Sequence, residues 1–101
     1  MNGIYRATIT AINGTGSGTV YLENGILKGG DGVFAYVGNY TIKGDRITAD
    51  IKLIQHGQDF SVLGGASSLS FSGKIGNNII EGVVTSTDSA AQGNITLSKI
   101  G

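Results

Sequence analysis

The sequence contains no cysteine, no proline and only one histidine, His56. Without cysteine the chain cannot form disulfides, thiolate metal sites or a thiolate nucleophile, which fits a reducing compartment. A single histidine cannot build a histidine cluster around a metal ion. Proline is absent while glycine occurs 18 times. Glycines inside strands permit the bends and close backbone contacts of a small barrel, here Gly18, Gly38, Gly73 and Gly82.

Charge is also scarce, at 14% of residues against 40% hydrophobic residues, and the net charge is zero. The chain is therefore expected to fold rather than to remain disordered. Its basic residues are scattered singly, so no positive stripe for nucleic acid is expected. The start, Met1 to Arg6, lacks the pattern of a secretory leader, and no apolar run approaches the roughly 18 residues of a membrane helix. We expect a cytoplasmic protein that inserts into no membrane.

The length of 101 residues predicts one domain over 1–101. Hydrophobic residues alternate with polar ones in several segments, which is the period of a half-buried antiparallel strand. Tyr5, Ala7 and Ile9, for example, alternate with Arg6 and Thr8. Strands are predicted near residues 4–12, 17–23, 26–29, 33–42, 46–55, 68–75, 78–86 and 92–99.

Turn residues separate these segments at short intervals, among them Asn13–Gly14 and Asn24–Gly25. Asn-Gly pairs supply the two positive φ angles of a type I′ hairpin turn. Eight consecutive hairpin-connected strands favour an all-β, lipocalin-like, antiparallel up-and-down barrel, since closure removes exposed sheet edges. A two-sheet sandwich is the alternative. The segment 55–67 has no alternation and is long for a hairpin loop, which is typical of a functional or mobile loop.

Catalytic patterns are weak, and we expect no enzyme, no cofactor and no metal site. A nucleophilic triad would require Asp59 and either Ser61 or Ser67 to converge on His56 within one loop. A solvated loop histidine is the simpler interpretation. The segment 13–18 is rich in glycine, but a strand rather than a helix follows it, so it does not fit a phosphate-binding loop.

The interior of an eight-stranded barrel is nearly filled by its own side chains unless small residues leave room for one ligand. The predicted inner faces carry both aromatic and small residues, and this combination is compatible with a packed core or with an apolar cavity. The candidate cavity residues are Tyr5, Ala7, Phe34, Tyr36, Tyr40, Ala49 and Phe71.

The segment 33–42 is apolar on both faces. If Phe34, Tyr36 and Tyr40 point inward, then Val33, Ala35 and Val37 point outward as an apolar stripe. Such a stripe on one strand predicts a partner surface. A homodimer in which this strand meets its own copy is expected.

Several short motifs along the chain occur in a characteristic order. They are Gly3-Ile4-Tyr5, Gly16-Ser17-Gly18, Asn24-Gly25, Gly29-Gly30-Asp31, Tyr36-Val37-Gly38, Asp45 with Ile47, and Ser61-Val62-Leu63. In this order and spacing the chain resembles the GrlR-type family, bacterial negative regulators of type III secretion and their relatives. The resemblance implies a lipocalin-like barrel that forms a homodimer, encloses an apolar cavity and binds a transcriptional activator protein.

The sequence departs from the family at one turn. The founding member of the family contacts its activator through four acidic residues before the fifth strand, whereas Lys43, Gly44, Asp45 and Arg46 occupy this turn here. Lys43, Asp45 and Arg46 are the candidate partner residues, of which only Asp45 keeps the acidic charge. We therefore expect a GrlR-like regulatory binding protein, able to hold an apolar small molecule. The alternative is a carrier of small molecules or lipids without a regulatory role.

Overall fold

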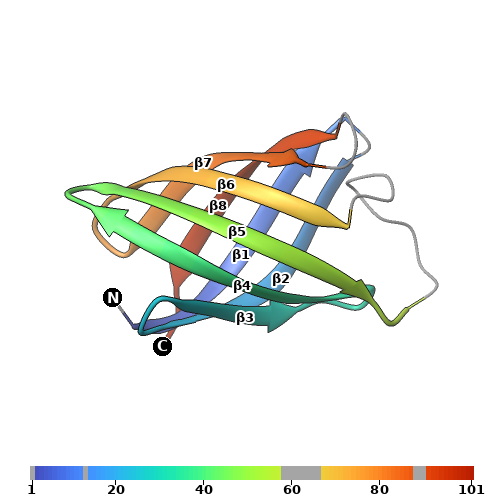
Figure 1. Ribbon diagram of the computed structural model, residues 1–101, viewed down its shortest axis with the longest axis horizontal. Helices are drawn as coiled ribbons and strands as arrows, with labels where there is room; N and C mark the ends of the chain where they lie inside the picture. Colours follow the sequence, from blue (N-terminus) through green and yellow to red (C-terminus); the bar gives the residue numbers. More distant parts are fainter. Residues whose placement is uncertain (1, 13, 58–66, 88–90) are drawn as a thin grey trace.

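The computed structural model describes residues 2–12, 14–57, 67–87 and 91–101. Every regular element in these residues is a strand, and the strands form one closed antiparallel barrel in sequence order (Figure 1). The strands are β1 (Gly3–Ala11), β2 (Gly14–Glu23), β3 (Ile26–Gly30), β4 (Phe34–Lys43), β5 (Arg46–Gln55), β6 (Ser68–Ile75), β7 (Ile79–Ser86) and β8 (Gln92–Lys99). The predicted up-and-down barrel is confirmed. Because β1 pairs with β8, the sheet closes, and the sandwich alternative is wrong.

The predicted strand ranges agree with the structure to within one residue at every end except the start of β2. β2 begins at Gly14, three residues before the predicted start, because Thr15 pairs with Thr10 and Gly14 with Ala11. These small and polar residues extend the backbone ladder without any change of hydrophobicity that the sequence could show. Ile12, predicted to end the first strand, lies outside it and is 99% exposed.

The predicted type I′ turn at Asn24–Gly25 is confirmed, since the φ angles are 50° and 84°. The Asn24 N–H also donates to Asn2 Oδ1 at 3.1 Å. The turn Lys43–Gly44–Asp45 uses a positive φ of 61° at Gly44. Asn13, of the other predicted Asn-Gly turn, lies outside the described residues, as do residues 58–66 of the predicted long loop.

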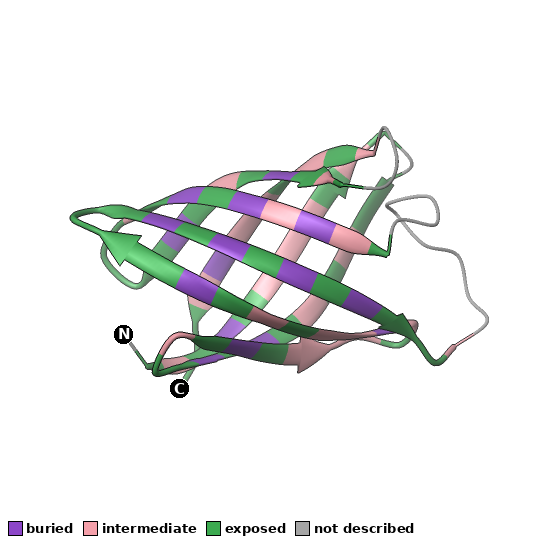
Figure 2. Ribbon diagram, in the orientation of Figure 1, coloured by how far each residue is buried: buried purple, intermediate pink, exposed green. Residues whose placement is uncertain are grey.

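Inward and outward side chains alternate along each strand, visible as the purple and green bands of Figure 2. Among the described residues, no polar or charged side chain is fully buried. The buried core consists of Tyr5, Val20, Leu22, Leu27, Phe34, Tyr40, Ile47, Ala49, Ile51, Leu53, Leu69, Phe71, Ile80, Val84 and Leu97.

Strand glycines let a core aromatic ring lie against the backbone, and at Gly82 they also permit the close backbone contact that the sequence predicted. A Cβ at Gly73 would lie 2.7 Å from Phe71 Cζ, and one at Gly82 would lie 2.8 Å from Phe71 Cε1. The Phe71 ring therefore covers both glycines. The Gly82 position would also place its Cβ 2.2 Å from the Ser72 carbonyl oxygen, so a side chain there would require the strands to move.

The two ends of the barrel differ. The β2–β3, β4–β5 and β6–β7 turns lie at one end together with both chain termini, and we call this the terminal end (Figure 1). The β3–β4 connection, Asp31–Val33, lies at the opposite end, which we call the loop end. β1, β5 and β7 end at the loop end, and β2, β6 and β8 begin there.

Candidate binding pocket

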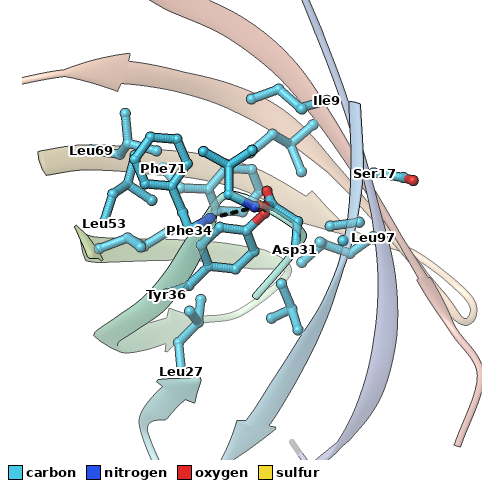
Figure 3. Close-up of a pocket in the computed structure, with 16 residues that line it drawn as sticks. Ile9, Ser17, Leu27, Asp31, Phe34, Tyr36, Leu53, Leu69, Phe71 and Leu97 are labelled. Carbon is cyan, nitrogen blue, oxygen red and sulfur yellow. Dashed lines mark hydrogen bonds between the residues drawn. The ribbon is translucent and has the colours of Figure 1, made fainter. Parts of the chain in front are cut away.

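The barrel interior contains a pocket of about 100 Å³ whose lining includes the β3–β4 connection of the loop end (Figure 3). Most of its lining is aliphatic or aromatic and comes from the inner faces of the strands. The lining residues are Ala7, Ile9, Ser17, Gly18, Val20, Leu27, Asp31, Val33, Phe34, Tyr36, Ile51, Leu53, Leu69, Phe71, Ile95 and Leu97. Such a concave apolar space with few polar groups is the usual form of a small-molecule site.

Small residues leave this space open on one wall. Ala7 and Gly18 are direct cross-strand partners in β1 and β2, so two neighbouring positions carry almost no side-chain volume. Part of the space above Gly18 is taken by the hydroxyl of Tyr36, since a Cβ on Gly18 would lie 2.8 Å from that oxygen. Ala7 and Gly18 are therefore too small to fill this part of the barrel.

The predicted cavity residues divide into two groups. Ala7, Phe34, Tyr36 and Phe71 line the pocket. Tyr5, Tyr40 and Ala49 are buried in the core but are not among the lining residues. The alternation of hydrophobic and polar residues correctly predicted that these side chains point into the barrel. It could not predict which of them border empty space.

The other twelve of the sixteen lining residues were not predicted as cavity residues, and Asp31 and Val33 are the two whose place differs most from expectation. Val33 was expected to point outward as part of the dimer stripe, and this placement is wrong because Val33 lines the pocket and packs against the core. It precedes β4, which begins at Phe34, so strand alternation does not apply to it. For Asp31 the sequence predicted no role in the cavity. The signal for its role was the Asp-Gly pair, because aspartate in a turn commonly accepts hydrogen bonds from the following backbone N–H groups.

Asp31 forms a polar corner of the pocket together with Tyr36 (Figure 3). Its Oδ1 accepts hydrogen bonds from the backbone N–H of Val33 at 2.7 Å and of Phe34 at 2.8 Å. Its Oδ2 accepts a hydrogen bond from the Tyr36 hydroxyl. The Asp31 N–H donates to the Phe34 carbonyl at 2.9 Å, which closes the connection into a tight turn. The carboxylate is thus fixed by its own loop before any ligand binds.

The end of β5 holds this connection in place. The backbone N–H groups of His56 and Gly57 both donate to the Val33 carbonyl, at 2.8 and 3.1 Å. His56 Nε2 lies 3.1 Å from the Asp31 carbonyl oxygen, and because a carbonyl only accepts, Nε2 is the donor in this contact. The His56 side chain is exposed, as predicted, and it contacts the β3–β4 connection. Asp59 and Ser61, two other members of the candidate triad, lie outside the described residues, and Ser67, the alternative nucleophile, is exposed directly before β6.

Burial and the neighbouring charge keep the Tyr36 hydroxyl protonated. Desolvation raises the pKa of Tyr36 well above its ordinary value, and the hydrogen bond to Asp31 and the negative charge of Asp31 raise it further. Burial, followed by the proximity of Tyr40, raises the pKa of Tyr5 in the core. Tyr36 therefore acts as a hydrogen-bond donor to Asp31 at neutral pH.

The predicted partner residues lie on the outer surface. Lys43, Asp45 and Arg46 are exposed at the terminal end, where Arg46 Nη2 donates to Ser72 Oγ at 3.1 Å. Val37 points outward and is 43% exposed, while Ala35 is half-buried on the same face. The pocket and the turn at residues 43–46 are thus separate surfaces.

Within the described residues no group of three or more histidine, cysteine, aspartate or glutamate side chains is arranged to hold a metal ion. No helix with the length and hydropathy of a membrane span occurs in that part of the chain. A comparison of the sequence with models of protein families gives no match, and a comparison with curated proteins gives none either.

Proposed function

We propose that this protein is a non-enzymatic binding barrel that holds a small, mainly apolar molecule in the pocket at its loop end. The observation that carries this proposal is the space of about 100 Å³ among aliphatic and aromatic side chains in the barrel interior. Interiors of proteins normally leave few voids larger than a water molecule. Because most of the lining is apolar, an apolar ligand should replace water in this pocket favourably.

The volume limits the ligand to about the size of one aromatic ring. An apolar cavity of about 150 Å³ in another protein holds benzene, and the present pocket is smaller and bordered by the β3–β4 connection. Very small ligands reach at most about 1.5 kcal/mol of binding free energy per non-hydrogen atom. We expect dissociation constants of about 0.1 to 1 mM for a single-ring probe, equivalent to about 4 to 5.5 kcal/mol.

Titration calorimetry with toluene tests the proposal. Wild type should bind one equivalent, and Ala7→Leu, which adds volume to the pocket wall, should lose binding while keeping the wild-type circular dichroism spectrum. Thr48→Leu is the matched control, because Thr48 is exposed on the outer face of β5. Absence of toluene binding to the wild-type protein would contradict the proposal.

A second proposal, the homodimer implied by the GrlR-type resemblance, is supported by the outer face of β1–β4. Ile4, Tyr21 and Val37 are 36%, 44% and 43% exposed. Tyr21 pairs with Ile4 across β1–β2 and with Lys28 across β2–β3, and Lys28 pairs with Val37. The three apolar side chains therefore lie in one row across the barrel. The exposed Val83 of β7 pairs with Ser72 and Asn94, so it belongs to a different part of the surface.

We propose this row as the contact of a homodimer, with Val37 and Ala35 near its edge. Sedimentation equilibrium at micromolar concentration should give a dimer for wild type and a folded monomer for Val37→Glu. Thr48→Glu places the same charge on the outer face of the next strand, away from the row, and should leave the dimer intact. A wild-type monomer would refute the dimer.

The regulatory role and the carrier role differ in what accompanies the protein in its cell. A pull-down from the native cell, with mass spectrometry of proteins and extracted small molecules, separates them. A transcriptional activator recovered with wild type but not with Val37→Glu or Asp45→Lys supports the regulator. Recovery of a small molecule without any protein supports the carrier.

A further inference from the structure

We propose that the pocket selects ligands whose polar end donates hydrogen bonds, an ammonium group above all, and that Asp31 and Tyr36 form the acceptor subsite for that group. This inference rests on the proposed function, since it names the ligand class of the same pocket. It predicts a small arylalkyl or alkyl amine as the ligand and excludes carboxylates such as fatty acids.

The first step of the argument is the direction of each hydrogen bond in the polar corner. A carboxylate offers about four lone-pair positions. The N–H groups of Val33 and Phe34 occupy Oδ1 of Asp31, and the Tyr36 hydroxyl occupies one position of Oδ2. One lone pair of Oδ2 is left over. The Tyr36 hydroxyl keeps its proton and directs it at Asp31, so toward a ligand its oxygen also offers only lone pairs.

The second step is that the described lining residues include no positively charged donor. Among the described residues that line the pocket there is no lysine, arginine or histidine, and Asp31 is the only residue that can carry a charge at neutral pH. Ser17 is exposed, and its hydroxyl points away from the other lining side chains in Figure 3. A carboxylate or phosphate ligand would therefore meet a negative charge without a partner in a mainly apolar space, which is costly. An ammonium group would meet the opposite charge and two acceptor atoms.

The third step is that the corner is rigid before binding. Two backbone N–H groups fix the Asp31 carboxylate, and the absence of a side chain at Gly18 admits the Tyr36 hydroxyl. The β3–β4 connection is in turn held by the backbone of His56 and Gly57. A ligand that binds here does not have to order these groups, and preorganised acceptors discriminate well between donors and acceptors.

Titration calorimetry at pH 7 with four single-ring probes tests the inference. We use benzylamine, benzyl alcohol, toluene and benzoate, which differ mainly in the polar end. Benzylamine should bind at least tenfold more tightly than benzoate, with benzyl alcohol between them. Equal affinities for all four probes, with toluene bound, would overturn the inference and leave the proposed function standing. Failure of every probe to bind would overturn both.

Two variants show whether Asp31 and Tyr36 act on the ligand or only shape the loop. Asp31→Asn keeps an oxygen for the Val33 and Phe34 N–H groups, while its amide N–H donates to the Tyr36 oxygen and frees the Tyr36 proton for the ligand. Benzylamine affinity should fall at least tenfold and benzoate affinity should rise. Tyr36→Phe keeps the Asp31 charge and should keep the preference for benzylamine over benzoate. The affinity for benzyl alcohol should fall.

Toluene serves as the control for pocket integrity in each variant. If toluene affinity is unchanged and the ratio of benzylamine to benzoate affinity also stays at the wild-type value in Asp31→Asn, the residue has only a structural role and the inference is wrong. If Asp31→Asn does not fold, the wild-type probe series and Tyr36→Phe decide, because both measure the same preference with the carboxylate in place.

Discussion

The same substitution at two inward-facing alanines should have opposite effects on stability. Ala7 lines the pocket, with Gly18 and Leu97 as its cross-strand partners. Ala49 is 5% exposed, lies outside the pocket lining, and pairs with Tyr40 on one side and Phe71 on the other. Leucine at position 7 extends into empty space, whereas leucine at position 49 meets two aromatic rings.

The magnitudes follow from the number of carbon atoms buried. Leucine adds three carbons to alanine, and each buried carbon stabilises the fold by about 0.8 kcal/mol. Ordering a leucine side chain costs about 0.5 to 1 kcal/mol. Ala7→Leu should therefore stabilise the protein by up to about 1.5 kcal/mol. Ala49→Leu should destabilise it by about 1 to 3 kcal/mol, as overpacking of a filled core does.

Urea denaturation followed by circular dichroism measures both variants, since a shift of the midpoint at a constant m value reports stability. In thermal melts a change of 1 kcal/mol corresponds to about 4 to 8 °C for a domain of this size. If Ala7→Leu destabilised the protein as much as Ala49→Leu, the wall beside Ala7 would have no free space, and the pocket argument would be refuted.

Three further predictions concern the backbone, a titrating group and the surface. Gly82→Ala should cost about 2 to 3 kcal/mol, because its Cβ would lie 2.2 Å from the Ser72 carbonyl oxygen, whereas Gly76→Ala, whose nearest contact is 3.5 Å, should be nearly neutral in urea titrations. Folding raises the Tyr36 pKa, so the protonated Tyr36 side chain stabilises the fold fully below about pH 10, and this stabilisation is lost as the pH rises further. Urea midpoints should therefore fall less steeply above about pH 10 in Tyr36→Phe than in wild type, and equal slopes would contradict the assignment. Asp45→Lys, in an exposed turn, should change the free energy of unfolding by no more than about 0.5 kcal/mol, and a larger loss in the same titration would show a structural role for this carboxylate.

Local rules predicted the barrel well. The alternation of Ile47, Ala49 and Ile51 with polar residues defines one strand, and those side chains are buried as expected. The Asn24–Gly25 pair defines a turn through two positive φ angles. Both signals depend on neighbouring residues alone, which is why the sequence carries them.

The pocket depends on distant residues, and the sequence showed only part of it. Whether Ala7 or Ala49 borders free space depends on the total volume of side chains from several strands. The alternation of residues along one strand gives no information about that total volume. Asp31 reaches the interior by folding back within its turn to meet Tyr36. Val33 faces the pocket because it belongs to the connection, where alternation no longer determines direction.

The most direct test of the central claim is a methyl NMR titration of the wild-type protein with toluene. We predict saturable shifts at methyl groups that line the pocket, such as those of Ala7, Leu69 and Ile95. The methyl groups of Leu22 and Ile47, buried in the packed part of the core, should stay unchanged. Shifts confined to exposed residues such as Val37, or no saturable shifts at all, would contradict the account.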